Sequence, residues 1–175
     1  MELIQPSLTY KKSFEEAIEE LRAIGDDLSF LKEIGSPKSI KEYIRIRKDH
    51  MKGKNLPSDW IPASTFWLVD KGEFIGEGHL RHFLTDQLRK EGGHIGYNVR
   101  PSRRQQGYGT QMLRLLLVKA REMGIEKTLV TCDETNVASR KIIEANGGVL
   151  ERAENLGEGK PLKLLFWIEL KKKNL

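Results

Sequence analysis

The chain has 175 residues, of which 38% are hydrophobic and 31% are charged, which is typical of one globular domain and excludes a disordered protein. Its formal net charge of +5 would favour an anionic ligand but is too small to predict a nucleic-acid groove. The single cysteine, Cys132, excludes an intramolecular disulfide, and no apolar run reaches the roughly 18 residues that span a bilayer. We expect one domain over residues 1–175 with neither a membrane nor a nucleic-acid partner. Because the start, Met1–Leu3, lacks the features of a secretion signal, we expect a cytoplasmic protein.

Helical spacing dominates the first third of the chain. Ser13 and Glu16 have the spacing of a capping box, and apolar residues then recur at helical intervals until Gly25. Ser36, followed by a proline, offers the cap of a second helix that ends before Gly53. The sequence therefore predicts two helices before the first strand.

The hydrophobic period then changes to that of strands. Thr65–Val69 and the pair Phe74–Ile75 flank the four residues 70–73, which have the composition of a hairpin turn. Residues 83–91 are polar and ambiguous, with a short helix as one interpretation. His94–Val99 is the next predicted strand, and it ends before Pro101.

The last third alternates helices and strands. A helix that carries Met112 and Leu116 stops at Gly124, and Thr128–Cys132 follows as a short buried strand. A further helix is predicted from Val137 to about residue 146, and Leu164–Ile168 forms the last strand. The organisation is that of a mixed α/β domain.

The loop between the strand at 94–99 and the following helix has the chemistry of an anion site. The first turn of a helix offers unpaired N–H groups and the positive end of the helix dipole, and Gly107 allows a close approach. Arg100, Arg103 and Arg104 add positive charge. An ordinary basic loop capped by glycine is the alternative. The spacings of a Rossmann turn and of a nucleotide triphosphate loop are both absent.

The run Arg104-Gln-Gln-Gly-Tyr-Gly109 matches the [R/Q]-x-x-G-x-[G/A] signature of the GNAT superfamily of N-acetyltransferases, which this chain resembles from about Thr65 to Leu170. Gly92–Pro101 is similar to a bacterial branch known mostly as predicted acetyltransferases. The resemblance implies a central mixed, mostly antiparallel sheet with splayed middle strands, flanked by helices. It also implies direct transfer of an acetyl group from acetyl-CoA, as co-substrate, to an amine.

The resemblance assigns cofactor contacts to particular positions of this chain. Residues of the strand would lie along the pantetheine arm, and residues of the turn would hold the pyrophosphate. An N-x-x-S sequence at the start of the next helix would touch the cofactor, although a helix cap and a small packed residue explain it nearly as well. The expected cofactor residues are Asn98, Val99, Arg104, Gln105, Gly107, Tyr108, Gly109, Thr110, Asn136 and Ser139.

The chemistry requires a base, because an alkylamine is mostly protonated at neutral pH. Our first candidate is His94, which stands in a strand where many relatives carry glutamate. Glu77 and His79 share one face of the preceding strand and are the alternatives, and Glu134 is a weaker one.

Other catalytic roles are less well defined by the sequence. The family oxyanion donor would be a backbone N–H near Val99. No acid is assigned, because Ile143 stands where the family commonly has a tyrosine, and Tyr97 is interpreted as a core residue. Cys132 as a nucleophile is disfavoured, since a lone cysteine at a strand end is usually a small buried residue.

The sequence leaves the partners broadly defined. The helices within residues 11–53 are expected to form part of the acceptor side, and the acceptor is a small-molecule or protein amine. A homodimer is compatible with the sequence. No metal is expected, since His79 and His82 would face opposite sides of a strand. The alternative functions are a non-catalytic module that binds acyl-CoA and, more remotely, a nucleic-acid-binding protein that uses the three arginines.

Overall fold

One sheet organises the chain in the computed structural model, which describes residues 1–26, 28, 31 and 37–170. Within these residues the strand order is β1-β2-β3-β4-β5-β7-β6. The strands are β1 Glu2–Ile4, β2 Ala63–Asp70, β3 Glu73–Arg81, β4 Ile95–Val99, β5 Lys127–Asp133, β6 Val149–Glu154 and β7 Lys163–Glu169. The helices are α1 Lys11–Ala23, α3 Ile40–Met51, α4 Asp86–Lys90, α5 Tyr108–Glu122 and α6 Val137–Ala145, with short 3₁₀ turns η1 at Leu8–Tyr10 and η2 at Pro101–Arg103.

The two N-terminal helices form where the sequence predicts them, but their caps differ. Ser13 lies inside α1, and its Oγ accepts a hydrogen bond from the Phe74 N–H at 3.0 Å, so it does not cap the helix. The cap of α3 is Ser39, whose hydroxyl accepts from the Glu42 N–H. The predicted cap Ser36 lies outside the described residues.

The strand β1 corrects the expectation that two helices precede the sheet. Its three residues are too few to show a strand period, and they pair antiparallel with β2 from Glu2↔Val69 to Ile4↔Trp67. The hairpin that follows is confirmed. Lys71 and Gly72 have φ values of 48° and 80°, and two left-handed central residues suit a two-residue hairpin turn.

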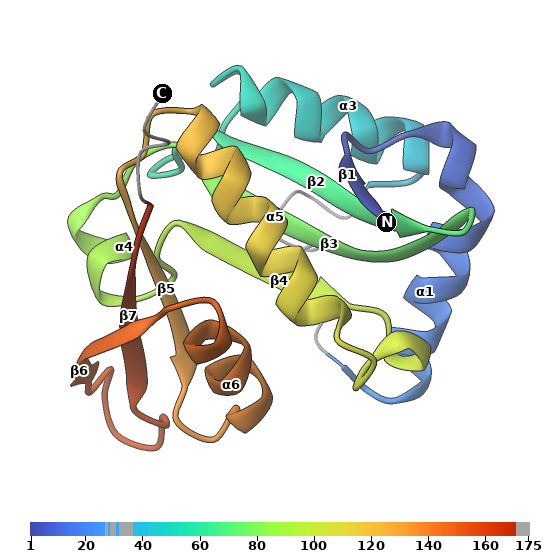
Figure 1. Cartoon of the computed structure of the whole chain (residues 1–175). Helices are drawn as coiled ribbons and strands as arrows, with labels where there is room; N and C mark the ends of the chain where they lie inside the picture. Colours follow the sequence, from blue (N-terminus) through green and yellow to red (C-terminus); the bar gives the residue numbers. More distant parts are fainter. Residues whose placement is uncertain (27, 29–30, 32–36, 171–175) are drawn as a thin grey trace, which may run out of the picture.

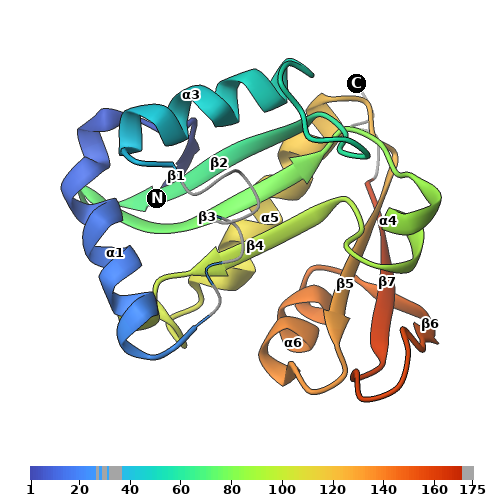
Figure 2. The ribbon, with the colours of Figure 1, turned by 180° about the vertical axis from the view of Figure 1, so that it is seen from behind.

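The sheet divides between β4 and β5. These two strands are parallel and share the register pair Ile95↔Val130, whereas every other neighbouring pair is antiparallel. Figures 1 and 2 show the two strands diverging toward the start of α5 and of α6. The mixed, mostly antiparallel sheet with splayed middle strands is therefore confirmed.

Helices cover both faces of the sheet. One buried cluster, which includes Leu113 and Leu116, packs α5 on β3 and β4, and a second, which includes Phe14, Tyr43 and Trp67, lies beneath α1 and α3. Accordingly α5 crosses in front of the strands in Figure 1 and lies behind them in Figure 2. None of the described helices is long and apolar enough to cross a membrane.

Candidate active site

A cleft of about 810 Å³ opens where β4 and β5 diverge. Its walls come from β3, β4, the turn into α5, and the first part of α6. Both faces of β4 contribute, because the splay removes the neighbouring strand that would otherwise close the sheet. Of the predicted cofactor residues, all but Tyr108 line this cleft: Asn98, Val99, Arg104, Gln105, Gly107, Gly109, Thr110, Asn136 and Ser139.

Gly107 and Gly109 of the turn suit glycine for different physical reasons. Gly107 caps α5 with φ of 82°, and Gln105 nearby has φ of 60°, so the turn uses left-handed backbone. That conformation suits glycine at position 107. A Cβ on Gly109 would instead come within 2.6 Å of Ile142 Cδ1, so a larger residue there would have to displace the end of that side chain where α5 contacts α6.

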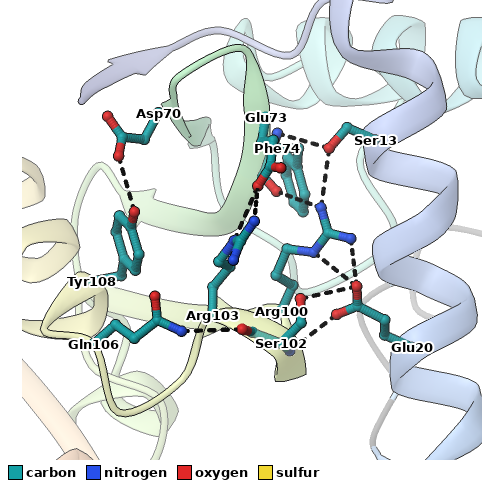
Figure 3. Close-up of polar contacts among 10 residues, drawn as sticks. All are labelled: Ser13, Glu20, Asp70, Glu73, Phe74, Arg100, Ser102, Arg103, Gln106 and Tyr108. Atoms are coloured by element: carbon teal, nitrogen blue, oxygen red, sulfur yellow. Dashed lines mark hydrogen bonds and ion pairs between the residues drawn. The ribbon is translucent and has the colours of Figure 1, made fainter.

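Only part of the predicted positive charge reaches the cleft. Figure 3 shows Arg100 bonded to Glu20, to Ser13 Oγ and to the Phe74 carbonyl, away from the turn. Arg103 is paired with Glu73 at 2.6 Å. These two arginines therefore link the turn after β4 to α1 and to β3. This departs from the expectation that all three arginines add charge to the site.

Arg104 is the arginine of the turn that lines the cleft. Its Nε donates to the Val99 carbonyl at 2.9 Å, and its Nη2 donates to Asn98 Oδ1 at 3.2 Å and to Asp26 Oδ2 at 2.5 Å. The guanidinium is therefore fixed between β4 and the segment after α1. In this arrangement a carboxylate neutralises its charge, and an anionic ligand would compete with that carboxylate.

Tyr108 is placed outside the cleft, contrary to the expectation of a cofactor contact. Its hydroxyl donates to Asp70 Oδ2 at 2.9 Å, at the end of β2 (Figure 3). The side chain leaves the first turn of α5 on the side away from the cleft. Its described contact therefore secures the helix start to the sheet.

At the start of α6, the N-x-x-S sequence caps the helix and also faces the cleft, so the helix-cap and cofactor-contact interpretations are compatible. Asn136 caps the helix by accepting from the Ser139 N–H at 3.0 Å, and both residues also line the cleft. Tyr97 Oη lies 3.1 Å from Ser139 Oγ. Tyr97 is thus a cleft residue as well as a neighbour of the core, because the splay exposes the strand face that parity alone assigns to the interior.

His94 occupies a structural position. It is 7% exposed and does not line the cleft. Its Nδ1 accepts from the Leu129 N–H at 2.9 Å, and its backbone N–H donates to the Leu129 carbonyl at 2.7 Å, so His94 joins β4 to β5 beside their register pair Ile95↔Val130. Burial lowers the pKa of His94 to about 4. This placement argues against His94 as the catalytic base.

Glu77 reaches the cleft from β3 but is surrounded by donors. Its carboxylate accepts from the Tyr43 hydroxyl, from Trp67 Nε1 at 2.7 Å and from Arg47, and His79 Nε2 lies 2.8 Å away. Burial raises the pKa of Glu77, but His79, Arg47 and the hydrogen bonds outweigh burial and lower it to about 2. A carboxylate this acidic is a poor proton acceptor and a good orienting group.

His79 forms the other half of the pair and also lines the cleft. Its Nδ1 lies 3.0 Å from the Thr65 hydroxyl, and burial lowers the pKa of the imidazole below 6.5. With Glu77 ionised, Nε2 carries the proton and Nδ1 has the lone pair that can accept one. His79 is paired in register with Gly96, and a Cβ added to Gly96 would meet nothing within 4 Å. Space for a substrate therefore lies next to the imidazole.

The part of the chain that the structure describes contains no group of three or more histidine, cysteine, aspartate or glutamate side chains that could hold a metal ion. The side chains that line the cleft include hydroxyls, the Glu77–His79 imidazole–carboxylate pair and, near the glycine turn and α6, the charged residues Arg104, Asp26 and Lys141.

The open mixed sheet with a glycine turn at its split has the arrangement that the resemblance of the sequence implies. The family model described as "Acetyltransferase (GNAT) domain" matches residues 18–149. The chain therefore belongs to the GNAT acetyltransferases.

Solved structures agree with this fold. RimL, a ribosomal L7/L12 alpha-N-protein acetyltransferase in complex with coenzyme A, superposes with a TM-score of 0.66 at 17% identity, covering 97% of this chain and 98% of that chain. The putative acetyltransferase yncA from Salmonella typhimurium, with acetyl-CoA, has a TM-score of 0.63 at 12% identity, covering 99% and 96%. The microcin C7 self immunity acetyltransferase MccE, with acetyl-CoA and AMP, has a TM-score of 0.63 at 18% identity, covering 95% and 91%. No curated protein matches the sequence at a significant level.

Proposed function

We propose that this protein transfers an acetyl group from acetyl-CoA directly to an amine acceptor in the cleft between β4 and β5. The observation that carries the proposal is that one cleft brings together the glycine turn with Arg104 and the Glu77–His79 pair. The first supplies an anion site and the second a proton acceptor. An N-acetyltransferase needs both.

The glycine turn is our proposed site for the pyrophosphate of acetyl-CoA. The left-handed backbone at Gly107 opens α5 at the cleft, and the Arg104 guanidinium would bind the pyrophosphate in competition with Asp26. Asn98 and Val99 are proposed to follow the pantetheine arm, with Asn136 and Ser139 on the opposite wall. Acetyl-CoA supplies the thioester whose acetyl group is transferred.

The proton of the amine is proposed to go to His79 Nδ1, directly or through one water. Glu77 orients the ring by accepting from Nε2, as a carboxylate does in other imidazole bases. When Nδ1 gains a proton, the Thr65 hydroxyl can turn from donor to acceptor and stabilise the imidazolium. Glu77 is thus a positioning residue and His79 the base.

The N-terminal helices are proposed to form part of the acceptor side of a single domain over residues 1–175. Tyr43 and Arg47 of α3 contact Glu77, and Asp26, after α1, lines the cleft. A cytoplasmic location and the absence of nucleic-acid partners remain predictions from the sequence, and a homodimer remains compatible with it. Arg100 and Arg103 are engaged by carboxylates, which disfavours their use for nucleic acid.

The test is an acetylation screen. The purified protein is incubated with acetyl-CoA and one of several amines: a polyamine, an amino sugar, a free amino acid, or a peptide with a free N-terminus. Release of thiol is followed, and the product is identified by mass spectrometry. We expect acetylation of at least one class, with an amide product. Tight binding of acetyl-CoA without acetylation of any amine would favour the non-catalytic acyl-CoA module, and failure to bind acetyl-CoA would overturn the proposal.

A further inference from the structure

A buried arginine of α3 lies beside the Glu77–His79 pair. Arg47 is 8% exposed, its Nη2 lies 3.5 Å from Glu77 Oε1, and its Nε donates to the Tyr43 hydroxyl at 3.1 Å. The Tyr43 hydroxyl in turn donates to Glu77 Oε2. Arginine side chains are rarely buried unless they are paired, so the burial of Arg47 against the sheet calls for a physical reason.

Glu77 can take its countercharge from either of two cations. His79 Nε2 lies 2.8 Å from Glu77 Oε1, which is the same oxygen that Arg47 approaches. A protonated imidazole would balance the buried carboxylate, but His79 would then have no lone pair to accept the proton of the amine. A guanidinium keeps its charge at every physiological pH, so Arg47 can supply the cation in place of a protonated imidazole.

We propose that Arg47 is a positioning residue for the base: its permanent charge beside Glu77 Oε1 keeps the His79 imidazole neutral, with the proton on Nε2 and the lone pair on Nδ1. This inference rests on the proposed function, in which His79 takes the proton of the amine. A second cation on the imidazole would be repelled by the guanidinium, and this repulsion is strong where burial excludes water. Arg47 does not line the cleft, so it acts through Glu77 and His79.

Two cations act on the His79 ring. Burial contributes most to lowering the pKa of the imidazole, and the charges of Arg47 and, to a smaller extent, Arg81 lower it further, whereas Glu77 raises it. Arg81 lies two residues along β3, and its Nη1 donates to two carbonyls of the loop before β4 at 3.0 Å. Arg47 is therefore the one of these two cations that shares a carboxylate with His79.

The other described groups that contact the ring or its carboxylate are uncharged. The Thr65 hydroxyl of β2 lies 3.0 Å from His79 Nδ1, and Trp67 Nε1 donates to Glu77. Burial raises the pKa of the Tyr43 phenol well above its usual range, so this group stays neutral. On the side of β4, the register partner of the histidine is a glycine. Arg47 and Glu77 are thus the charges whose replacement tests the inference.

The first test is the pKa of His79, measured by nuclear magnetic resonance of the imidazole as pH is varied. The resonance is assigned by its loss in His79→Gln. Arg47→Gln keeps a hydrogen-bond donor but removes the charge, and we expect it to raise the pKa of His79 by about one unit or more. The contact of Arg47 with Glu77 is 3.5 Å long and involves one nitrogen. Arg47→Lys, which retains a charge, should therefore restore most of the wild-type value.

A double variant protects the test against loss of the fold. Arg47→Gln alone leaves a buried carboxylate with one cation fewer, which lowers the free energy of unfolding. Arg47→Gln combined with Glu77→Gln removes both charges, so His79 no longer has a carboxylate that favours its protonation. The pKa of His79 in the double variant should lie below that in Arg47→Gln. An equal or higher value would contradict the inference.

Kinetics connect the charge of His79 to acetyl transfer. In Arg47→Gln the acidic limb of kcat should move to higher pH by about the same one unit or more, while the affinity for acetyl-CoA is unchanged. Arg45→Gln is the matched control. Arg45 is an exposed arginine of the same helix, where it pairs with Glu42 and Asp49, and its replacement should move neither the pKa of His79 nor the acidic limb.

The outcomes separate this inference from the proposed function. If the wild type transfers acetyl groups but the pKa of His79 is the same in Arg47→Gln, the inference is overturned alone. If the pKa rises while the acidic limb of kcat does not move, His79 is not the base, and the inference falls with that assignment. If the wild type acetylates no amine, the proposed function is overturned.

Discussion

His79 and His94 lie in different environments of one sheet, and we expect their replacement to affect different properties, catalysis for His79 and stability for His94. His79 lines the cleft beside Glu77, whereas His94 is held between β4 and β5. Replacing His79 with Gln should lower kcat about 100-fold, because a positioned general base contributes at least that factor. Affinity for acetyl-CoA, measured by calorimetry, should be unchanged. A variant within threefold of wild type would exclude His79 as the base.

The pH profile gives an independent check on the same residue. The base must be neutral to act, and the pKa of His79 is lowered below 6.5. The rate constant kcat should therefore hold as pH falls to about 6.5 and decline only below it. In His79→Gln this acidic limb should disappear.

His94 should affect stability rather than catalysis. Because burial lowers its pKa from 6.5 to about 4, the unfolded chain binds a proton between these pH values and the folded protein does not. The free energy of unfolding should therefore fall with acidification across this window, by about 1–3 kcal/mol from this group. Urea unfolding at pH 7.5 and pH 4.5 measures the fall. His94→Asn retains an acceptor for the Leu129 N–H and should show a smaller fall, while keeping kcat within a few-fold of wild type.

Strand parity predicts some site residues and misleads on others. That Glu77 and His79 share a face follows from the period of two and is confirmed by their 2.8 Å contact. Which histidine serves the site does not follow, because His94 lies just before β4 and its environment depends on Leu129, distant in sequence. Parity indicates that Tyr97 faces the core, which it does contact, but parity cannot reveal that two strands separate there and open a cleft.

At the scale of elements, a carboxylate from α1 ties that helix to the turn before the glycine loop. Glu20 bonds to Arg100 and to the Ser102 N–H and hydroxyl (Figure 3). Burial raises the pKa of Glu20, but these bonds outweigh it and lower the pKa to about 2. A lowered carboxyl pKa means that its stabilising effect is present above about pH 4.5 and is lost as pH falls toward 2.

Glu20→Gln should therefore lower the free energy of unfolding by about 1–3 kcal/mol at pH 7, because it leaves buried Arg100 without its countercharge. Urea denaturation measures the change. Glu19→Gln is the matched control, since Glu19 is exposed and pairs with exposed Arg22 within the same helix; this pair should contribute less than about 1 kcal/mol. Equal effects of the two substitutions would contradict a special role for the contact with Arg100.

Most elements could be predicted because their local signals agree with their tertiary setting. The α5 helix has its apolar face, its glycine start and a glycine after its end, all readable from sequence. The cap of α1 could not be read correctly, because Ser13 is taken by Phe74 of the neighbouring hairpin. Strand β1 is stabilised by its partner β2 rather than by its own three residues.

At the scale of the whole molecule, the split sheet is what makes a site. Two antiparallel halves meet at one parallel register pair, and the cleft between them is lined by the turn, by the Glu77–His79 pair and by the hydroxyls of Tyr97 and Ser139. The family signature predicts the turn. It does not predict the carboxylate partner of each arginine. These partners are Glu20 in α1 for Arg100, Glu73 in the hairpin for Arg103 and Asp26 after α1 for Arg104.

The most direct test of the account is calorimetric titration with acetyl-CoA of the wild type, Arg104→Gln and Arg103→Gln. Adjacent arginines are compared: Arg104 lines the cleft, while Arg103 is paired with Glu73 outside it. We expect micromolar-range binding by the wild type, a loss of affinity of about tenfold or more in Arg104→Gln, and little change in Arg103→Gln. A charge-assisted hydrogen bond to phosphate contributes about 1.4 kcal/mol or more, which corresponds to about tenfold in affinity. Equal losses in both variants, or no binding by the wild type, would contradict acetyl-CoA binding at the turn between β4 and α5.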